Sequence, residues 1–279
     1  MRSLEYVSST GATVSFDGPL YAETAPALRG RAWAYTLGAS RLTGVAWQAR
    51  ELTLTIKALD APGELDRLRM LADHDMQAHA SDAAMCGLLR VDGEWECRAL
   101  IAKAEPQSIG PRIVETQLTV VQLSKWRRRL LTMSFLPVTA DTDASLDLPT
   151  DLPCDLMGMA QASALDVQGL DPMAWEMVVY GPAVNPHITI AGNTHQIDVT
   201  VPSGGYLLID AVAGERSVTL VAANGDRRNA FASAVRGEGE GSGRYVFQPL
   251  PAGVSAVSWP NSFGFDLTPI EERTEPPWT

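Results

Sequence analysis

The feature that most constrains the fold is a series of short apolar segments that recurs through the second half of the chain. Turn-forming pairs at 192–193, 204–205 and 224–225 separate several of these segments. Short strands punctuated by turn signals are typical of antiparallel sheets packed face to face. The pattern therefore predicts a β-sandwich, with strands in AWEMVVYG, HITIAG, QIDVTV, GYLLIDA, SVTLVA, RYVFQPL and GVSAVSW.

The first half predicts strands around one helix. Apolar and polar residues alternate at 52–56 and again at 114–120, which is the period of a half-buried strand. Between these runs, leucines at helical spacing pass through 63–79, and Pro62 suits the first turn of a helix. Strands are also expected at 13–16 and in the stretch that ends at Trp47. The fold class predicted for the chain is mainly β.

An Asp-Gly pair at 92–93 predicts a hairpin with a tight turn. A two-residue loop would place Cys97 opposite Leu88 and Cys86 opposite Ala99, so that the two cysteines become diagonal neighbours. Their Cα atoms would lie roughly 7–8 Å apart, which is long for a disulfide. We therefore expect free thiols, and a total of three cysteines fits a reducing compartment.

Charge divides the chain in two. Residues 1–134 carry 16 basic and 15 acidic side chains, giving +1, whereas residues 135–279 carry 6 and 18, giving −12. An Asp- and Pro-rich stretch, TADTDASLDLPTDLPCDL, lies beside this change. We therefore expect two domains, 1–134 and 135–279. The acidic second domain disfavours general binding of nucleic acid.

The sequence contains none of the usual catalytic or cofactor signatures. It has no G-x-S-x-G elbow, no P-loop and no H-E-x-x-H, and the glycines of GEGEGSG do not have dinucleotide-binding spacing. No stretch reaches the roughly 18 apolar residues of a membrane span, and the first twenty residues lack the apolar core of a secretory signal. We predict no enzyme, no catalytic residues, no cofactor and no membrane insertion.

Candidate metal ligands are also incomplete. His74 and His79 are five residues apart, so they do not share a helix face as an i, i+4 pair would. Asp141, Asp143 and Asp147 have calcium-loop spacing, but the sixth and twelfth positions of that loop are both leucine. We predict no metal site.

Two surfaces leave alternatives open. The run 126–129, Trp-Arg-Arg-Arg, either contacts phosphate with its tryptophan stacked on a base or forms an edge that pairs with another subunit. Trp259 and Tyr245 are candidates for a sugar-binding platform. Alternation places Tyr245 and Phe247 on one face of a strand, which instead favours core packing.

The order of motifs along the chain resembles a known family. The first half has strands, one helix with spaced leucines, a GLLRVDGEWE-type hairpin and a long closing strand. The second half has, in order, YGP at 180–182, NPHI at 185–188, LLID at 207–210, VTL at 218–220, NG at 224–225, NAF at 229–231, FQPL at 247–250, PAG at 251–253 and PPW at 276–278. In this combination the chain resembles the distal tail proteins of long-tailed bacteriophages, the hub of the tail tip or baseplate.

The resemblance implies an N-terminal split β-barrel with one helix over 1–134 and a C-terminal galectin-like or carbohydrate-module-like β-sandwich over 135–279. The first domain would close a homo-hexameric ring, with the second on its periphery. This hub would join the tail tube protein to tail-tip and receptor-binding proteins, and DNA would pass its lumen without specific binding. The resemblance further implies a place in the virion after assembly in the host cytoplasm.

A free-standing carbohydrate-binding or adhesive protein is the alternative function, and host cell-surface glycans are a further possible partner of either protein. Oligomeric state discriminates the two classes, because a hub forms a ring and a free binding module is a monomer. The near-neutral first domain can approach its own copies, whereas six copies of the acidic second domain would repel one another at close range.

Overall fold

The computed structural model is mainly β, which confirms the predicted fold class. It describes residues 3–22, 25–137, 161–260 and 262–277. The Asp- and Pro-rich connection, including Asp141, Asp143 and Asp147, lies outside the described residues.

The chain divides into two compact units. The first consists of residues 1–128 together with 272–279, and the second of residues 129–271. The first unit therefore takes in the C-terminal segment, although the charge pattern assigns that segment to the second half.

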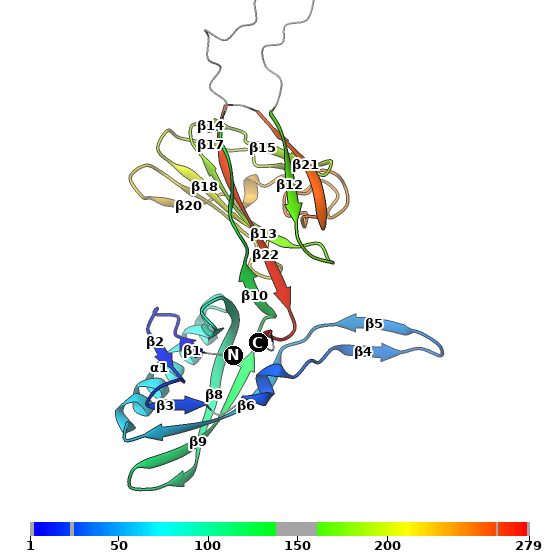
Figure 1. The fold of residues 1–279 in the computed structure, drawn as a ribbon. Helices are drawn as coiled ribbons and strands as arrows, with labels where there is room; N and C mark the ends of the chain where they lie inside the picture. Colours follow the sequence, from blue (N-terminus) through cyan, green and yellow to red (C-terminus); the bar gives the residue numbers. More distant parts are fainter. Residues whose placement is uncertain (1–2, 23–24, 138–160, 261, 278–279) are drawn as a thin grey trace, which may run out of the picture. The chain divides into compact units, whose positions relative to one another are not determined.

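An open antiparallel sheet forms most of the first unit (Figure 1). Its strands pair in the order β2-β1-β7-β8-β9-β6-β3 and do not close into a continuous barrel. The strands are β1 (Leu4–Val7), β2 (Thr13–Ser15), β3 (Leu20–Ala22), β6 (Arg50–Leu59), β7 (Gly87–Val91), β8 (Trp95–Ile109) and β9 (Ile113–Gln122). A 3₁₀ turn, η1 (Pro26–Arg29), a separate hairpin of β4 (Ala34–Leu37) and β5 (Leu42–Ala46), and β10 (Trp126–Arg129) complete the elements that begin in this unit.

Helix α1 (Pro62–Ser81) is the only α-helix of the described residues, and it matches the expected position. Proline at the first turn and an acidic residue, Glu64, favour its N-terminus. Leu65, Leu68 and Ala72 recur at helical spacing and are buried, so this face of the helix packs on β6 and β8.

A buried carboxylate ties the helix to the N-terminal strand. Asp75 is fully buried, and its Oδ2 accepts a hydrogen bond from the Tyr6 hydroxyl at 2.6 Å. Its Oδ1 accepts from the Ser8 hydroxyl at 2.9 Å and from both the amide and the hydroxyl of Ser9. Four donors therefore compensate the lost hydration of one carboxylate.

Gly87 leaves the space that the Tyr6 ring occupies. A Cβ added at Gly87 would lie 2.3 Å from the Tyr6 oxygen and 2.5 Å from its Cζ. Tyr6 is fully buried and held by Asp75, so its ring cannot swing away. We expect Gly87→Ala to lower the free energy of unfolding of the first unit by about 1–3 kcal/mol, measured by urea denaturation. Gly63→Ala, which meets no atom within 4 Å, is the control and should leave stability unchanged or slightly raised.

The hairpin between β7 and β8 differs from its expected register by one residue. Asp92 and Gly93 have positive φ of 54° and 71°, as a tight turn requires. However, the ladder pairs Leu89, rather than Leu88, with Cys97. Glu94 is thus an extra residue between turn and ladder, which the dipeptide signal alone does not reveal. Both described cysteines are free, as expected.

The second unit is a β-sandwich. One sheet has the order β11-β22-β13-β18-β19-β20, and the other β12-β21-β15-β16. The strands of the first are β11 (Met133–Phe135), β22 (Phe265–Arg273), β13 (Ala174–Tyr180), β18 (Tyr206–Asp210), β19 (Ser217–Val221) and β20 (Arg227–Asn229). Those of the second are β12 (Gln161–Val167), β21 (Gly253–Trp259), β15 (His187–Ile190) and β16 (Asn193–Gln196). A short pair, β14 (Ala183–Val184) and β17 (Thr200–Val201), and a 3₁₀ turn, η2 (Phe231–Ser233), accompany them.

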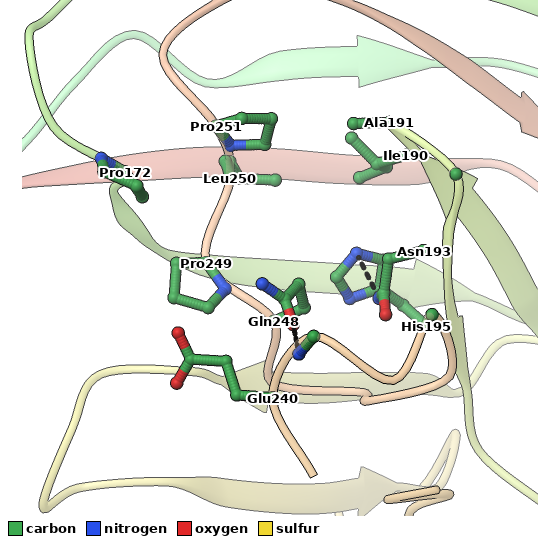
Figure 2. Close-up of a pocket in the computed structure, with 13 residues that line it drawn as sticks. Pro172, Ile190, Ala191, Asn193, His195, Glu240, Gln248, Pro249, Leu250 and Pro251 are labelled. Carbon is green, nitrogen blue, oxygen red and sulfur yellow. Dashed lines mark hydrogen bonds between the residues drawn. The ribbon is translucent and has the colours of Figure 1, made fainter. Parts of the chain in front are cut away.

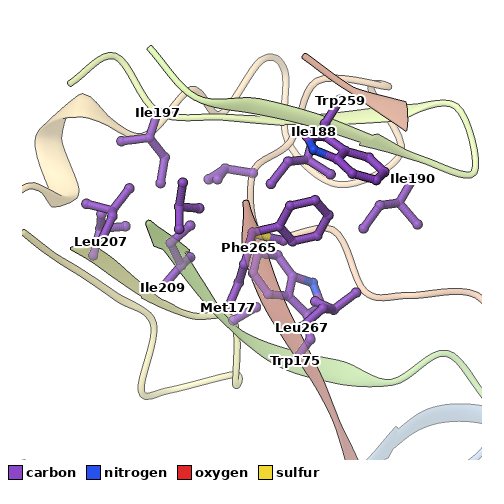
Figure 3. Packing of buried hydrophobic residues seen from close by; sticks show 14 of the residues in the cluster. Trp175, Met177, Ile188, Ile190, Ile197, Leu207, Ile209, Trp259, Phe265 and Leu267 are labelled. Atoms are coloured by element: carbon purple, nitrogen blue, oxygen red, sulfur yellow. The ribbon is translucent and has the colours of Figure 1, made fainter. Parts of the chain in front are cut away.

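Both sheets contribute to one core (Figure 3). Trp175 and Leu267 come from the first sheet, and Ile188 and Trp259 come from the second. All four are at most 2% exposed. Alternation along each strand places these residues inward, which is the period that predicted the sandwich.

Two predicted strands differ from the structure: QIDVTV at 196–201 is interrupted between the end of β16 and the start of β17, and RYVFQPL at 244–250 is not a strand. The second segment is irregular, and its consecutive residues Val246 and Phe247 are both buried, which a strand facing one core does not allow. Side chains of β16 hydrogen-bond to the backbone of this segment, which forms no strand ladder. Asn193 accepts from the Tyr245 amide and donates to its carbonyl, at 3.1 and 3.0 Å, and His195 Nδ1 lies 2.7 Å from the Val246 carbonyl.

Candidate functional site

One exposed apolar feature of the first unit is the hairpin of β4 and β5, which we call the arm (residues 33–46). Its strands pair with each other and with no other described strand, and in Figure 1 the arm extends away from the sheet of its own unit. Tyr35 faces Val45 and Leu37 faces Leu42 across the pair. All four side chains are more than half exposed.

An isolated two-stranded hairpin is marginally stable in water. Few local contacts support the arm; at its base, the Lys125 ammonium lies 5.8 Å from the centre of the Trp33 ring. Exposed apolar side chains gathered on one element mark interaction surfaces. The arm therefore has the composition of a segment that is covered by a partner.

A second exposed apolar group lies at one end of the main sheet of the first unit. Leu59 faces Ile113 across β6 and β9, and Ile109 is 77% exposed at the end of β8. An exposed ion pair between Arg112 and Asp60 (2.6 Å) borders the group. This end of the sheet is a second surface suited to contact with another protein.

The basic run 126–129 is engaged within the protein. Trp126 is fully buried, so its ring is not available to stack on a base. Arg127 is 12% exposed and pairs with Glu96 at 3.4 Å, while Arg129 makes two hydrogen bonds to Glu176 at 2.8 and 2.9 Å. These partners favour neither the phosphate contact nor the subunit edge that the run suggested.

The two residues of the expected sugar platform have different surroundings. Trp259 is 2% exposed, contacts Phe135 and Phe265 edge to face, and donates from Nε1 to the Phe263 carbonyl at 3.1 Å. Its ring faces the core rather than solvent. Tyr245 is half-buried beneath the guanidinium of an arginine at position 216, 5.6 Å from the ring centre. The geometry does not bring the two rings into one platform.

A cavity of about 350 Å³ lies in the second unit between the β15–β16 turn and the loop at 240–251 (Figure 2). Pro172, Pro249 and Pro251 line it together with Glu240 and Gln248. Sequence spacing gave no signal for this cavity, because its lining comes from segments up to 79 residues apart. Its size is within the range of small-ligand sites.

Buried polar groups form the wall of this cavity. His195 Nδ1 lies 2.7 Å from the Val246 carbonyl, which can only accept, so Nδ1 carries the proton. The other ring nitrogen, Nε2, is then the acceptor for the Asn193 amide at 3.3 Å. Burial lowers the pKa of His195 to about 4, against the smaller opposing effect of the Val246 hydrogen bond. The imidazole is therefore neutral near pH 7 and anchors the loop.

The part of the chain that the structure describes offers neither a metal-binding cluster nor a membrane-spanning helix. There, no three His, Cys, Asp or Glu side chains gather closely enough to hold a metal ion. His79 and His187 each lie near a backbone carbonyl instead, at 2.9 and 3.3 Å. The one helix in these residues lacks the long apolar stretch needed to cross a bilayer.

No protein-family model matches the chain, and no curated protein matches its sequence. Solved structures do match it over almost its full length. They are baseplate proteins of bacteriophages. A structure of the phage p2 baseplate in its activated conformation with Sr aligns with a TM-score of 0.60 and 10% identity, covering 99% of this chain and 100% of that one. The corresponding structure with Ca has a TM-score of 0.58, again with 10% identity and the same coverage.

The third match is the SPP1 Dit (gp 19.1) protein, described as a paradigm of the hub adsorption apparatus in phages that infect Gram-positive bacteria. It aligns with a TM-score of 0.55 and 8% identity, over 96% of this chain and 99% of that one. The structural neighbours of this chain are thus phage baseplate and hub proteins, as the order of sequence motifs predicted. At 8–10% identity, the likeness establishes a shared fold.

Proposed function

We propose that this protein is a structural component of a phage tail tip, where copies of it form a hub ring. The observation that carries the proposal is the match of the whole chain, both units in order, to baseplate and hub proteins. In the same proposal the ring is a homo-hexamer that joins the tail tube protein to tip and receptor-binding proteins. It is assembled in the host cytoplasm and belongs to the virion.

The arm supports self-assembly through the first unit. It presents paired apolar side chains that the described part of its own chain leaves uncovered. The charge of +1 over 1–134 permits several copies to approach, and −12 over 135–279 favours a peripheral place for the second unit. A closed ring also gives the open sheet edges of the first unit partners or cover.

The experiment compares the association of the full chain with that of an arm variant. We expect light scattering and sedimentation to show a closed oligomer as the protein concentration rises. Tyr35→Ser with Val45→Ser removes one facing apolar pair without adding charge, and should weaken association by about 30-fold or more. Leu170→Ser with Val254→Ser is the matched control, because both residues are at least 75% exposed but lie in the second unit.

A wild-type chain that stays monomeric at the highest attainable concentration contradicts self-assembly. Equal weakening by the arm variant and the control assigns the contact to another surface. A stable monomer would instead favour the free-standing carbohydrate-binding protein, whose structural support is the cavity beside Glu240.

A further inference from the structure

A second hollow of the sandwich unit is lined by basic and polar side chains. It has a volume of about 270 Å³ and lies at β19 and β20, where β20 ends its sheet. Figure 1 shows β20 at the margin of that sheet. We call it the arginine groove; the residues that line it are Arg216, Arg227, Arg228, Ser217, Thr219 and Asn229, together with the apolar Val218 and Phe231.

The groove is basic, although the second half of the chain is acidic overall. Residues 135–279 have a net charge of −12, yet five of their six basic residues lie within 216–244. None of the residues lining the groove is acidic. Arg227 and Arg228 form no ion pair with a carboxylate of the described chain, and both are exposed. Arg227 and Arg228 line the groove without a carboxylate partner, so their positive charges favour an anion there.

Aromatic rings hold part of the groove in place. The Arg216 guanidinium lies over two rings, 5.6 Å from the centre of Tyr245 and 5.8 Å from that of Phe247. Stacking fixes the plane of a guanidinium and leaves the N–H groups at its edge free to donate. Arg236 stacks on Phe231, which also lines the groove, at 4.3 Å, and adds a further positive charge beside it. One of the three arginines that line the groove is thus held in place before a ligand binds.

We propose that the arginine groove binds a phosphate group of a phosphorylated ligand. Each guanidinium has five N–H donors, and the hydroxyls of Ser217 and Thr219 add further donors. Together these groups offer more donors than the four lone-pair positions of one carboxylate can accept. A phosphate has more acceptor oxygens and a charge of about −1.5 to −2 at neutral pH. An acidic peptide adding to the sheet edge fits less well, because β20 has only three residues with which to form a ladder.

The test measures binding to the full-length protein by calorimetry at low salt, with three probes in separate arms. The probes are inorganic pyrophosphate, the phosphomonoester glycerol phosphate and polyglutamate. We expect the phosphate probes to bind and polyglutamate not to bind. Arg227→Gln with Arg228→Gln should weaken phosphate binding by about tenfold or more. Tighter binding of glycerol phosphate than of pyrophosphate would identify an ester-borne phosphate, and the reverse a free one.

Arg244→Gln is the matched control, because Arg244 is exposed in the same unit but does not line the groove. The Arg244→Gln variant should bind the phosphate probes as tightly as the wild-type protein does. The proposal is overturned if neither phosphate probe binds, if polyglutamate binds in their place, or if Arg244→Gln weakens binding as much as the groove variant. These readouts do not depend on oligomer formation, so the result stands apart from that of the hub proposal.

Discussion

Replacing Asp75 by alanine is expected to lower the free energy of unfolding of the first unit by about 4 kcal/mol. The carboxylate is fully buried, and removing it leaves the Tyr6 and Ser8 hydroxyls and two donors of Ser9 without their acceptor. Unpaired buried polar groups keep their full desolvation cost. Burial raises the pKa of Tyr6, and the hydrogen bond to Asp75 raises it further, so the phenol remains a donor throughout the accessible pH range. Urea denaturation measures the effect.

Two further variants make this prediction specific. Asp73→Ala removes an exposed carboxylate from the same helix and should change stability little. Asp75→Asn keeps the shape but turns one acceptor into a donor that faces other donors, and should fall between wild type and alanine. Equal losses from Asp73→Ala and Asp75→Ala would contradict the prediction, because helix propensity favours alanine over aspartate and the loss would then not come from the buried network.

Strands and the helix could be predicted from the sequence because their signal is local. The alternation at 52–56 and the leucine spacing at 63–79 report burial on one face, and β6 and α1 lie at these positions. The sandwich follows from the same kind of signal repeated along the second half. Periodicity of this kind needs no knowledge of the partner element, so it is available from one sequence.

The segment 244–250 shows where local signals fail. Its apolar residues satisfy a strand pattern, but the main chain is held by Asn193 and His195, about 50 residues earlier in the sequence. The register of the hairpin at 92–93 fails for a related reason, since the dipeptide specifies the turn but not the extra residue after it. Pairings between a side chain and a distant backbone group carry no periodic signal.

Candidate surfaces were harder to predict than elements. Trp259 resembles a surface aromatic because it ends a strand, yet the opposite sheet buries it. The arm differs in the opposite direction from Trp259. Tyr35 and Val45 lie in alternating strand patterns that predict burial, but both face solvent. Sequence pattern indicates which residues favour burial and not whether the same chain provides the cover. An apolar pattern without cover is the signal for a partner, and it requires the structure.

Lowering the pH from about 6.5 to 4 is expected to destabilise the second unit through His195 by about 3 kcal/mol. Burial holds the pKa of this imidazole at about 4 in the folded state, below its ordinary value of 6.5. Between these values the unfolded chain binds a proton that the folded chain does not. The contribution is therefore complete above pH 6.5 and is lost as the pH falls toward 4. Urea denaturation at a series of pH values measures the slope.

Carboxylates also titrate in this range, so the informative quantity is the difference between matched proteins. His195→Gln can still donate to the Val246 carbonyl but cannot take up a proton, and its stability should fall less steeply with pH than that of the wild type. His187→Gln removes an exposed histidine from the neighbouring strand and should keep the wild-type slope. Equal slopes for His195→Gln and the wild type would contradict this prediction. They would mean that the folded protein protonates His195 as readily as the unfolded chain does, so that the hydrogen bond to Val246 offsets the effect of burial on its pKa.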